Sequence, residues 1–297
     1  MHASVLRYFS AVVDCGSIRK AAESLNVASS AVNRQILKLE DGFGVPLFDR
    51  TPSGVRLTAA GEILLRHVEG TLRDFERAQA EIHELQGLKT GLVQVAALES
   101  LLVDFLPQVV EDFSRVHPGV TYAVIQRGPA DIVDDVGTGH AEIGISFANV
   151  ATPSVRLVAE IDMPIGVVMA ADHPLAREKE IRLEDCRRYP IFLMPDVRPM
   201  MPMIAQDLSR AGLLAEPKVV TNSLDMMKPL VAAGTGIAFF TRLAFAREIA
   251  RGELVHVALV DADVARLKIA IMVQRDRRLS PAADSFVDFM TARFLAL

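Results

Sequence analysis

Residues 17–40, SIRKAAESLNVASSAVNRQILKLE, contain two short runs of apolar residues at helical spacing with only three residues between them. Ser17 can cap the first of these two helices, and Ala21 and Ala22 give it a small apolar face that another helix can approach closely. Asn26 stands at the reversal, and asparagine tolerates the left-handed backbone conformation better than most residues other than glycine. The spacing therefore predicts two helices joined by a tight turn.

A further helix is predicted upstream over residues 4–14, and Gly16 ends it. In the last of the three helices Val32, Ile36 and Leu39 form a stripe that we expect to be buried. The opposite face is polar and basic, and it consists of Ser29, Ser30, Asn33, Arg34 and Lys38. This pattern favours a helix-turn-helix that turns its second helix toward a partner. An ordinary helical hairpin with a solvated face is the alternative, which the two helices alone leave open.

The segment 44–58, GVPLFDRTPSGVRLT, has two extended pieces around the turn sequence Pro52-Ser53-Gly54, with Arg50 and Arg56 on either side of its tip. We interpret it as a β-wing. A wing beside a recognition helix can lay arginines along phosphates while the helix contacts base edges.

Thr58 can cap a long helix that we expect to reach about residue 88. Apolar and small residues recur along it at alternating spacings of four and three, which is the seam of a coiled coil. The seam comprises Leu64, Val68, Thr71, Phe75, Ala78, Ile82 and Leu85. We expect it to pair with a second copy of the chain, and packing on the chain's own C-terminal domain is the alternative.

Beyond residue 90 short apolar strands alternate with helices, which predicts α/β sheets with a parallel core. Strands are expected near 92–97, 120–126, 142–147, 155–160, 165–170, 190–194, 217–221, 236–240, 253–258 and 267–274, and helices near 100–115, 129–137, 199–211, 223–233, 242–250 and 280–295. About 200 residues can form one domain or two lobes. The segments 120–146 and 217–240 resemble each other, as expected of a two-lobed binder with a cleft.

The charge is distributed unevenly along the 297 residues. The chain carries a formal net charge of −5, yet residues 1–57 have seven Lys and Arg against five Asp and Glu, so that segment is +2 and the remainder is −7. We expect only the N-terminal segment to meet a polyanion.

Cys15 and Cys186 are far apart and are expected to be buried and reduced, which favours the cytoplasm. No apolar run is long enough for a membrane span, and Arg7 and Asp14 interrupt any signal peptide.

The N-terminal motifs resemble those of the LysR-type transcriptional regulators. The matching residues are Gly16-Ser17, Ala21-Ala22-xx-Leu25-Asn26-Val27, Ala31-Val32-Asn33-Arg34-Gln35-Ile36-xx-Leu39-Glu40, Gly44-Val45-Pro46-Leu47-Phe48-Asp49-Arg50 and Leu57-Thr58-xx-Gly61. Weaker matches follow at 105–120, 173–176 and 230–240, so the resemblance covers the whole chain. Ala28 departs from the serine that usually caps the recognition helix in the family.

The resemblance implies an α+β multidomain protein with a winged helix-turn-helix over 1–58, a dimerising linker helix over 59–88 and a two-lobed effector domain over 89–297, like type 2 periplasmic binding proteins. Lobe I would comprise 89–162 and 267–297, and lobe II 163–266. The implied DNA contacts are Ser29, Ser30, Asn33, Arg34, Lys38, Arg50, Gly54 and Arg56. Leu64, Val68, Phe75, Ile82 and Leu85 would form the dimer contact. The expected partners are operator or promoter DNA, a small-molecule effector, further copies of the chain as a dimer or dimer of dimers, and RNA polymerase.

In a two-lobed binder the ligand lies at the carboxyl ends of strands and the amino ends of helices. The matching positions are Glu99, Ser100, Arg127, Gly128, Ser146, Phe147, Met194, Arg198, Thr221 and Ser223. Arg127 and Arg198 could hold an anion, and methionines 194, 200, 201 and 203 could form an apolar wall. We expect a small, partly apolar organic acid as the effector, and an amine held by Glu99 is the competing interpretation.

An enzyme and a transport binding protein are the two alternative functional classes. The Gly-Thr-Gly sequences at 137–139 and 234–236 each follow a helix and open a strand, whereas a phosphate-binding loop needs the reverse order. No catalytic or metal motif was found, so we expect neither an enzyme nor a cofactor. A transport binding protein would share the two-lobed body but would require an export signal.

Overall fold

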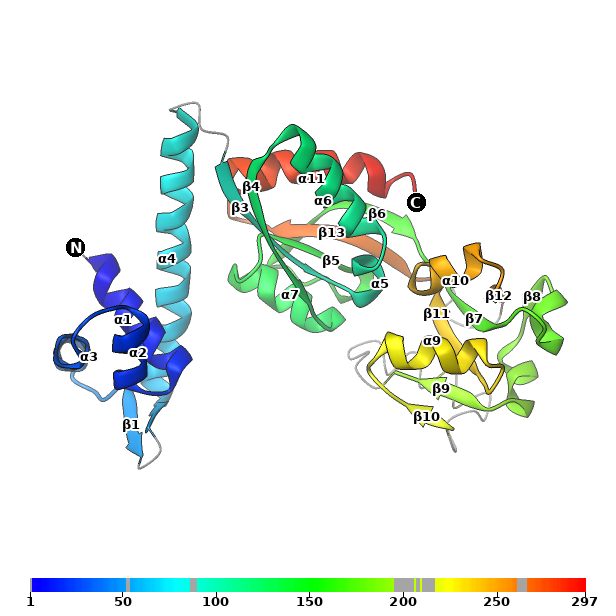
Figure 1. Cartoon of the computed structure of the whole chain (residues 1–297), viewed down its shortest axis with the longest axis horizontal. Coiled ribbons are helices and arrows are strands. Elements are labelled where there is room, and N and C mark those ends of the chain that lie inside the picture. Colours follow the sequence, from blue (N-terminus) through cyan, green and yellow to red (C-terminus); the bar gives the residue numbers. More distant parts are fainter. Residues whose placement is uncertain are drawn as a thin grey trace. The chain divides into compact units, whose positions relative to one another are not determined.

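The computed structural model describes residues 2–51, 54–85, 90–194, 217–260 and 266–297, together with Gln206 and Ser209. It divides into two compact units, Met1–Gln86 and Gly87–Leu297 (Figure 1). Each unit has a hydrophobic core of its own, so the two are described separately.

The first unit opens with three helices, α1 (His2–Cys15), α2 (Ile18–Ser24) and α3 (Ser29–Phe43). Gly16 ends α1 with a φ of 60°, and the hydroxyl of Ser17 accepts a hydrogen bond from the backbone of Lys20 to cap α2. Asn26, between α2 and α3, has a φ of 53°. The left-handed turn expected of Asn26 is therefore confirmed, and with it the close approach of α2 and α3.

A two-stranded antiparallel sheet follows α3. It consists of β1 (Phe48–Thr51) and β2 (Gly54–Leu57), paired from Phe48 opposite Leu57 to Thr51 opposite Gly54. The strand pair that the sequence predicted is confirmed, while Pro52 and Ser53 at its tip lie outside the described residues.

The long helix is α4 (Ala59–Leu85). Its first turn is capped by Thr58, whose hydroxyl accepts a hydrogen bond from the backbone N–H of Gly61 at 3.1 Å, as the sequence indicated. The predicted extension of this helix to residue 88 lies outside the described residues.

The core of the first unit joins α4 to the three shorter helices. Its buried members are Phe9, Val12, Ala21, Ala22, Val32, Ile36, Leu47, Phe48, Leu64 and Val68. Leu64 and Val68 are 8% and 0% exposed, so the chain's own fold already covers them. This revises the sequence-based seam, because neither residue can line a face that is presented to a second chain. Phe75 and Ile82 are 45% and 54% exposed and still fit such a face, and the side chain of Leu85 is not described.

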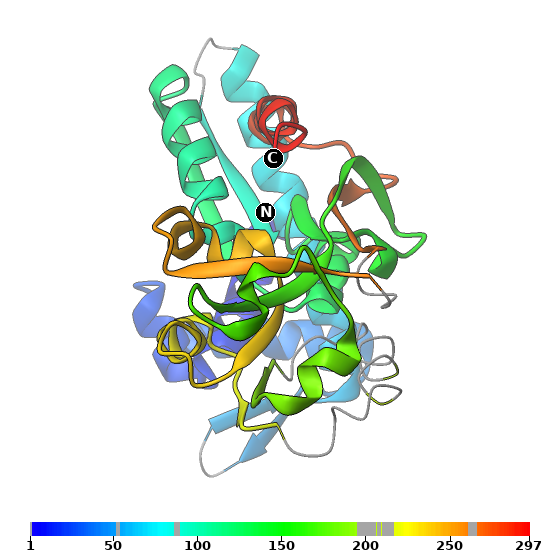
Figure 2. The ribbon, with the colours of Figure 1, turned by 90° about the vertical axis from the view of Figure 1, so that its right-hand side faces the viewer.

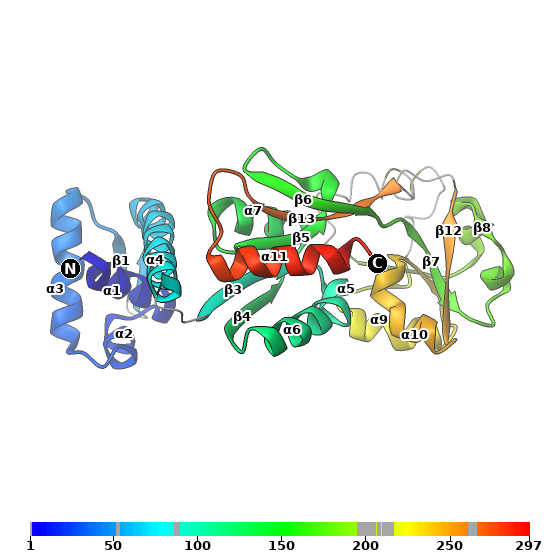
Figure 3. The same cartoon turned by 90° about the horizontal axis from the view of Figure 1, so that it is seen from above.

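The second unit contains two mixed sheets. The five-stranded sheet has the order β4-β3-β5-β13-β6, with β3 (Thr90–Ala97) parallel to both β4 and β5, and β13 antiparallel to both β5 and β6. The remaining strands are β4 (Gly119–Gln126), β5 (Ile143–Phe147), β6 (Val155–Asp162) and β13 (Lys268–Gln274). Helices α6 (Phe105–Val116) and α11 (Pro281–Phe294) cover one face, and α7 (Pro129–Thr138) covers the other (Figures 1 and 3).

The six-stranded sheet has the order β10-β9-β11-β7-β12-β8. Figure 2 is viewed from the side on which this sheet lies. Its strands are β7 (Ile165–Ala170), β8 (Glu180–Ile181), β9 (Ile191–Leu193), β10 (Val219–Val220), β11 (Ile237–Thr241) and β12 (Leu254–Leu259). On one face α9 (Leu224–Ala232), the 3-10 turn η4 (Arg242–Phe245) and α10 (Ala246–Ala250) bury Met227, Val231 and Phe245 against Val168 and Phe192. The chain passes from the five-stranded sheet, here called lobe I, to the six-stranded sheet, lobe II, after β6, and returns before β13.

Every strand predicted in the second unit is present, but several other elements differ from the sequence-based interpretation. The predicted helix 100–115 is two helices, α5 (Glu99–Leu102) and α6, separated at Val103 and Asp104. Strand β8 was not predicted, and the helix predicted over 242–250 begins as the 3-10 turn η4. The helix predicted over 199–211 lies outside the described residues except for Gln206 and Ser209. Among the described helices none has the length and apolar composition that a membrane span requires.

The two halves of α4 should respond differently to truncation of an apolar side chain. Leu64→Ala removes a buried side chain, so the free energy of unfolding should fall by about 2–5 kcal/mol at every protein concentration. Ile82→Ala removes an exposed side chain and should change the unfolding midpoint only through self-association, and hence in a concentration-dependent way. Denaturant unfolding followed by circular dichroism at several concentrations separates the two effects. A weakened self-association with unchanged stability in Leu64→Ala would contradict this assignment.

Candidate functional site

The exposed face of α3 is the first candidate surface. Its opposite face is fixed, because Val32 and Ile36 are 0% and 2% exposed in the core of the first unit. The five polar residues predicted to face outward are arranged accordingly: Ser29, Ser30, Arg34 and Lys38 are exposed, and Asn33 is half-buried. Ala28 occupies the N-cap position and provides no side-chain hydrogen bond. The backbone N–H groups of the first turn of α3 are therefore not capped by that side chain.

The two cations of this face have no acidic partner among the described residues. Within the part of the chain that the structure describes, neither Arg34 nor Lys38 forms an ion pair, whereas Arg19 on α2 lies 3.6 Å from Glu23. Unpaired cations beside serine and asparagine side chains on an exposed helix suit a polyanion with hydrogen-bonding edges.

The wing supplies a second part of this surface. Arg56 on β2 is exposed, and the side chain of Arg50 is not among those described. Gly54 has a φ of 140°, and a Cβ atom there would lie 2.2 Å from the carbonyl oxygen of Gly16. The backbone N–H of Val55 donates to the same oxygen at 2.9 Å. Gly54, which the sequence placed among the contact residues, thus has a packing reason to be glycine.

A second candidate site lies in the other unit, at one edge of the lobe I sheet. Strands β3, β4 and β5 are mutually parallel, and Ala97 is aligned with both Gln126 and Ile145. Their carboxyl ends therefore meet at one edge and bring together residues that are far apart in sequence. The predicted residues gathered there are Glu99, Ser100, Arg127, Gly128, Ser146 and Phe147.

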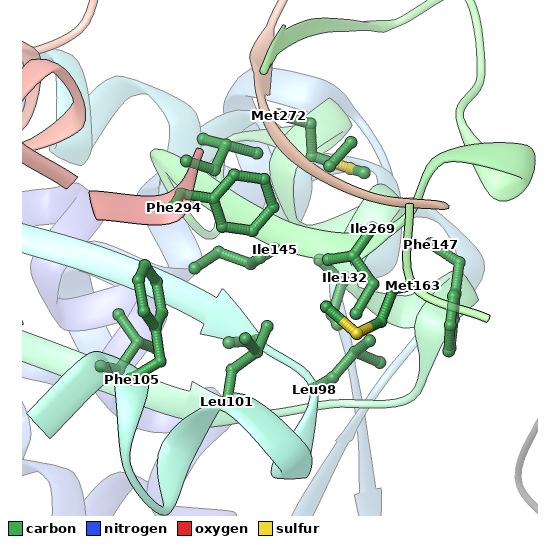
Figure 4. Close-up of a cluster of buried hydrophobic side chains, with 14 of the residues drawn as sticks. Leu98, Leu101, Phe105, Ile132, Ile145, Phe147, Met163, Ile269, Met272 and Phe294 are labelled. Atoms are coloured by element: carbon green, nitrogen blue, oxygen red, sulfur yellow. The ribbon is translucent and has the colours of Figure 1, made fainter. Parts of the chain in front are cut away.

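Several of these side chains are already engaged within lobe I. Arg127 is paired with Asp135, with Nε to Oδ2 at 3.1 Å. Ser146 is fully buried and donates to the carbonyl of Pro129 at 3.0 Å. Phe147 is 7% exposed and lies beside Met163 in the apolar cluster of Figure 4. Ser146 and Phe147 are thus interior residues rather than parts of an open wall, and Arg127 is no free anion clamp.

The predicted residues of lobe II also meet. Thr221 donates its backbone N–H to the carbonyl of Leu193 at 3.0 Å, which places it next to the half-buried Met194. The hydroxyl of Ser223 accepts from the backbone of Met226 at 3.2 Å and so caps α9. Ser100 does not cap a helix, because α5 begins one residue earlier and has Leu98 at its N-cap. Arg198 and methionines 200, 201 and 203 lie outside the described residues.

Among the residues predicted to bind the effector, Glu99 makes a contact between the two lobes. Its carboxylate accepts a hydrogen bond from the backbone N–H of Leu224, the first residue of α9, and lies near Asp225 and Lys228. Burial is the largest influence and raises the pKa of Glu99, while the Leu224 hydrogen bond opposes it. The oxygen Oε2 is buried and has no hydrogen-bond partner among the described residues. Among the described residues Glu99 forms no ion pair with Arg127, which is paired with Asp135 instead.

A second contact between the lobes was not predicted from the sequence. Arg247 of α10 forms an ion pair with Asp104 and donates to the carbonyl of Val103 at 2.7 Å, at the break between α5 and α6. The break had a sequence signal, because Pro107 is tolerated in the first turn of a helix but disrupts a helix interior. Glu99 and Arg247 therefore connect opposite ends of α5 to lobe II.

Metal-ligating side chains are not clustered in the described part of the chain, where no three His, Cys, Asp or Glu residues are placed to hold an ion. Cys186 is buried and Cys15 is half-buried.

Two family descriptions match the chain. Residues 4–62 match "Bacterial regulatory helix-turn-helix protein, lysR family", and residues 86–295 match "LysR substrate binding domain". The two matches fall on the first and second units of the fold.

Curated relatives of similar length are transcriptional regulators. The regulator CbbR of Xanthobacter flavus is 30% identical over 291 residues, which cover 96% of this chain and 86% of that protein. The transcriptional dual regulator GltC of Bacillus subtilis (strain 168) is 28% identical over 294 residues, which cover 98% of this chain and 97% of that protein. The RuBisCO operon regulator of Acidithiobacillus ferrooxidans is also 28% identical, over 97% of this chain and 92% of its own length.

Solved structures show the same fold at lower sequence identity. A full-length OxyR variant from Pseudomonas aeruginosa matches with a TM-score of 0.71 and 22% identity, over 98% of this chain and 96% of that one. CbnR, a LysR family transcriptional regulator, matches with a TM-score of 0.69 and 20% identity, over 98% and 99% of the two chains. CbnR bound to its target DNA gives a TM-score of 0.68 with the same identity and coverage. The chain therefore belongs to the LysR family, as a DNA-binding transcriptional regulator with a substrate-binding domain and not an enzyme.

Proposed function

We propose that the chain reads a promoter with α3 in the major groove and the wing on the adjacent backbone, and that a small molecule bound between its lobes changes transcription. The first part rests on Arg34 and Lys38, which are exposed and have no acidic partner among the described residues, on a helix whose apolar stripe is buried.

The contacts divide by chemistry. Asn33 and Arg34 are assigned to base edges, because asparagine can bond bidentately to adenine and arginine to guanine. Ser29 and Ser30 lie at the amino end of the same helix, where they can reach bases or phosphates. Lys38, Arg50 and Arg56 are assigned to phosphates, which fix the register of the protein on the duplex.

Self-association is assigned to the second half of α4. Phe75 and Ile82 are exposed there, with Thr71 and Ala78 on the same stripe. A second copy packed along this stripe would present two recognition helices to two half-sites. We also propose that two such dimers associate and that the protein contacts RNA polymerase at the promoter.

The class of effector depends on Glu99. A partly apolar organic acid is the first candidate, since half-buried Met194 and the hydroxyl and amide groups around Thr221 and Ser223 suit one. Such an acid must compete with the Glu99 carboxylate for the amino end of α9. An amine is the second candidate, because Glu99 offers a carboxylate with one oxygen that lacks a partner among the described residues.

The effector would act by shifting an equilibrium between lobe arrangements. Glu99 and Arg247 hold α5 to lobe II at both ends in the structure described here. A ligand that competes for either contact has a differential affinity for the two arrangements, which is the requirement for coupling to the DNA-binding unit.

The recognition helix is tested by a footprint upstream of the gene that encodes the chain, at physiological salt. Arg34→Ala should weaken specific binding by about 5- to 150-fold, the equivalent of about 1–3 kcal/mol for one base pair contact. Arg66→Ala, which removes an exposed arginine from α4, is the matched control and should leave the footprint intact. Unchanged specific binding by the Arg34 variant would show that α3 does not read the bases.

The effector class is tested by the thermal midpoint of the full chain with benzoate or with benzylamine as probes. If acids are the effectors, benzoate raises the midpoint, and Glu99→Ala strengthens the response by removing the internal competitor. If amines are the effectors, benzylamine raises the midpoint and Glu99→Ala abolishes the response. If either probe shifts the midpoint equally in the parent chain and in Glu99→Ala, Glu99 is not part of the effector site.

The raised pKa of Glu99 predicts a pH dependence of stability. A carboxyl group whose folded-state pKa lies above its unfolded value favours folding fully below the unfolded pKa, and this contribution is lost as pH rises through the folded pKa. Glu99→Gln should therefore raise the thermal midpoint relative to the parent chain near pH 7.5, and the difference should shrink below about pH 4.3, the ordinary pKa of a glutamate. A constant difference at both pH values would contradict the assigned effect of burial.

A further inference from the structure

Glu40 connects the recognition helix to the wing. It lies in the last turn of α3, and its Oε1 atom accepts two backbone hydrogen bonds, from Leu47 at 2.8 Å and from Phe48 at 3.2 Å. Phe48 is the first residue of β1, so one carboxylate oxygen holds the point where the wing begins. Hydrogen bonds to an ionised acceptor are stronger than those between neutral groups.

Leu47 is held from its other side by α4. Its carbonyl accepts the backbone N–H of Thr58 at 3.0 Å, and its side chain is 1% exposed. A Cβ atom on Gly61, in the first turn of α4, would lie 2.2 Å from the same carbonyl oxygen. The start of the wing is therefore enclosed between α3 and α4, and Glu40 provides the bond to α3.

This anchor lies close to the wing's described cation. Arg56 is directly opposite Asp49 in the strand pair, and Asp49 is two residues beyond Leu47. Arg34 and Lys38 are on the same helix as Glu40. The spacing between the cations of α3 and Arg56 is thus set through a short chain of bonds in which Glu40 is the link on the helix side.

We infer that Glu40 is a positioning residue for DNA binding, which sets the wing so that Arg56 reaches a phosphate while α3 occupies the groove. Glu40 touches no DNA itself. The inference rests on the proposed wing contact of Arg56, and it assigns to Glu40 a role that the charge of an acidic residue near DNA would not suggest.

The test uses the full chain and a random-sequence duplex, because phosphate contacts do not depend on the operator. Binding is measured at several salt concentrations between about 50 and 200 mM. The slope of log K against log salt is negative, and the loss of one phosphate contact reduces its magnitude by about 0.9. Arg56→Ala is introduced alone and together with Glu40→Ala or Glu40→Gln. The two Glu40 variants remove the same charge, but only glutamine keeps an acceptor oxygen at that length.

Arg56→Ala should reduce the magnitude of the slope by about 0.9 in the parent chain and in Glu40→Gln. In Glu40→Ala it should leave the slope unchanged. Asp41→Ala, which removes an exposed carboxylate from the neighbouring position, should keep the full Arg56 effect. An undiminished Arg56 effect in Glu40→Ala, or identical behaviour of the alanine and glutamine variants, would overturn the inference.

Hydrogen exchange separates this inference from the proposed wing contact. The backbone amides of residues 44–51 should exchange faster in Glu40→Ala than in Glu40→Gln or Asp41→Ala, with residues 29–39 still protected. If Arg56→Ala leaves the salt slope of the parent chain unchanged, the proposed wing contact is wrong. If Glu40→Ala leaves the exchange of residues 44–51 unchanged, the role of Glu40 is wrong as well. If Glu40→Ala loses protection across 29–39, Glu40→Met takes its place, since methionine keeps the length without the acceptor.

Discussion

Burial of the apolar stripe of α3 is the interaction on which the DNA-binding unit depends. Val32 and Ile36 pack with Phe9, Val12 and the two alanines of α2, whose small side chains allow close approach. Once that stripe is buried, the opposite face of the helix is the one exposed to solvent. The left-handed Asn26 forms the turn between the helices, and the exposed face then carries two cations that have no acidic partner in the part of the chain that the structure describes. Function in this unit follows from packing on the opposite side of one helix.

The long helix α4 shows the limit of periodicity as evidence. Its apolar positions follow one uninterrupted pattern, yet Leu64 and Val68 are buried in the first unit while Phe75 and Ile82 are exposed. Spacing establishes which residues share a face, but it cannot distinguish burial within the chain from burial against a second copy. That distinction depends on where the shorter helices end, which is a property of the tertiary structure.

Local signals predicted most of the fold, whereas the contacts between the lobes join residues that are distant in sequence. The helix-turn-helix, the wing and every strand of the second unit except the two-residue β8 had local patterns of spacing, turns or caps. The pairing of Arg247 with Asp104, and of Glu99 with the backbone of Leu224, joins residues more than one hundred positions apart, and no local pattern indicates such partners. Ser146 and Phe147 were placed correctly at the end of β5, but position along a strand does not reveal that both side chains are interior.

Photo-crosslinking tests most directly the proposal that the exposed face of α3 enters a DNA groove. A photoreactive amino acid replaces exposed Ser30 and, as a control, exposed Gln79 on the second half of α4. If α3 enters the groove, the probe at position 30 crosslinks to bases within the operator and the probe at position 79 does not. Crosslinking from position 79 with none from position 30 would contradict it.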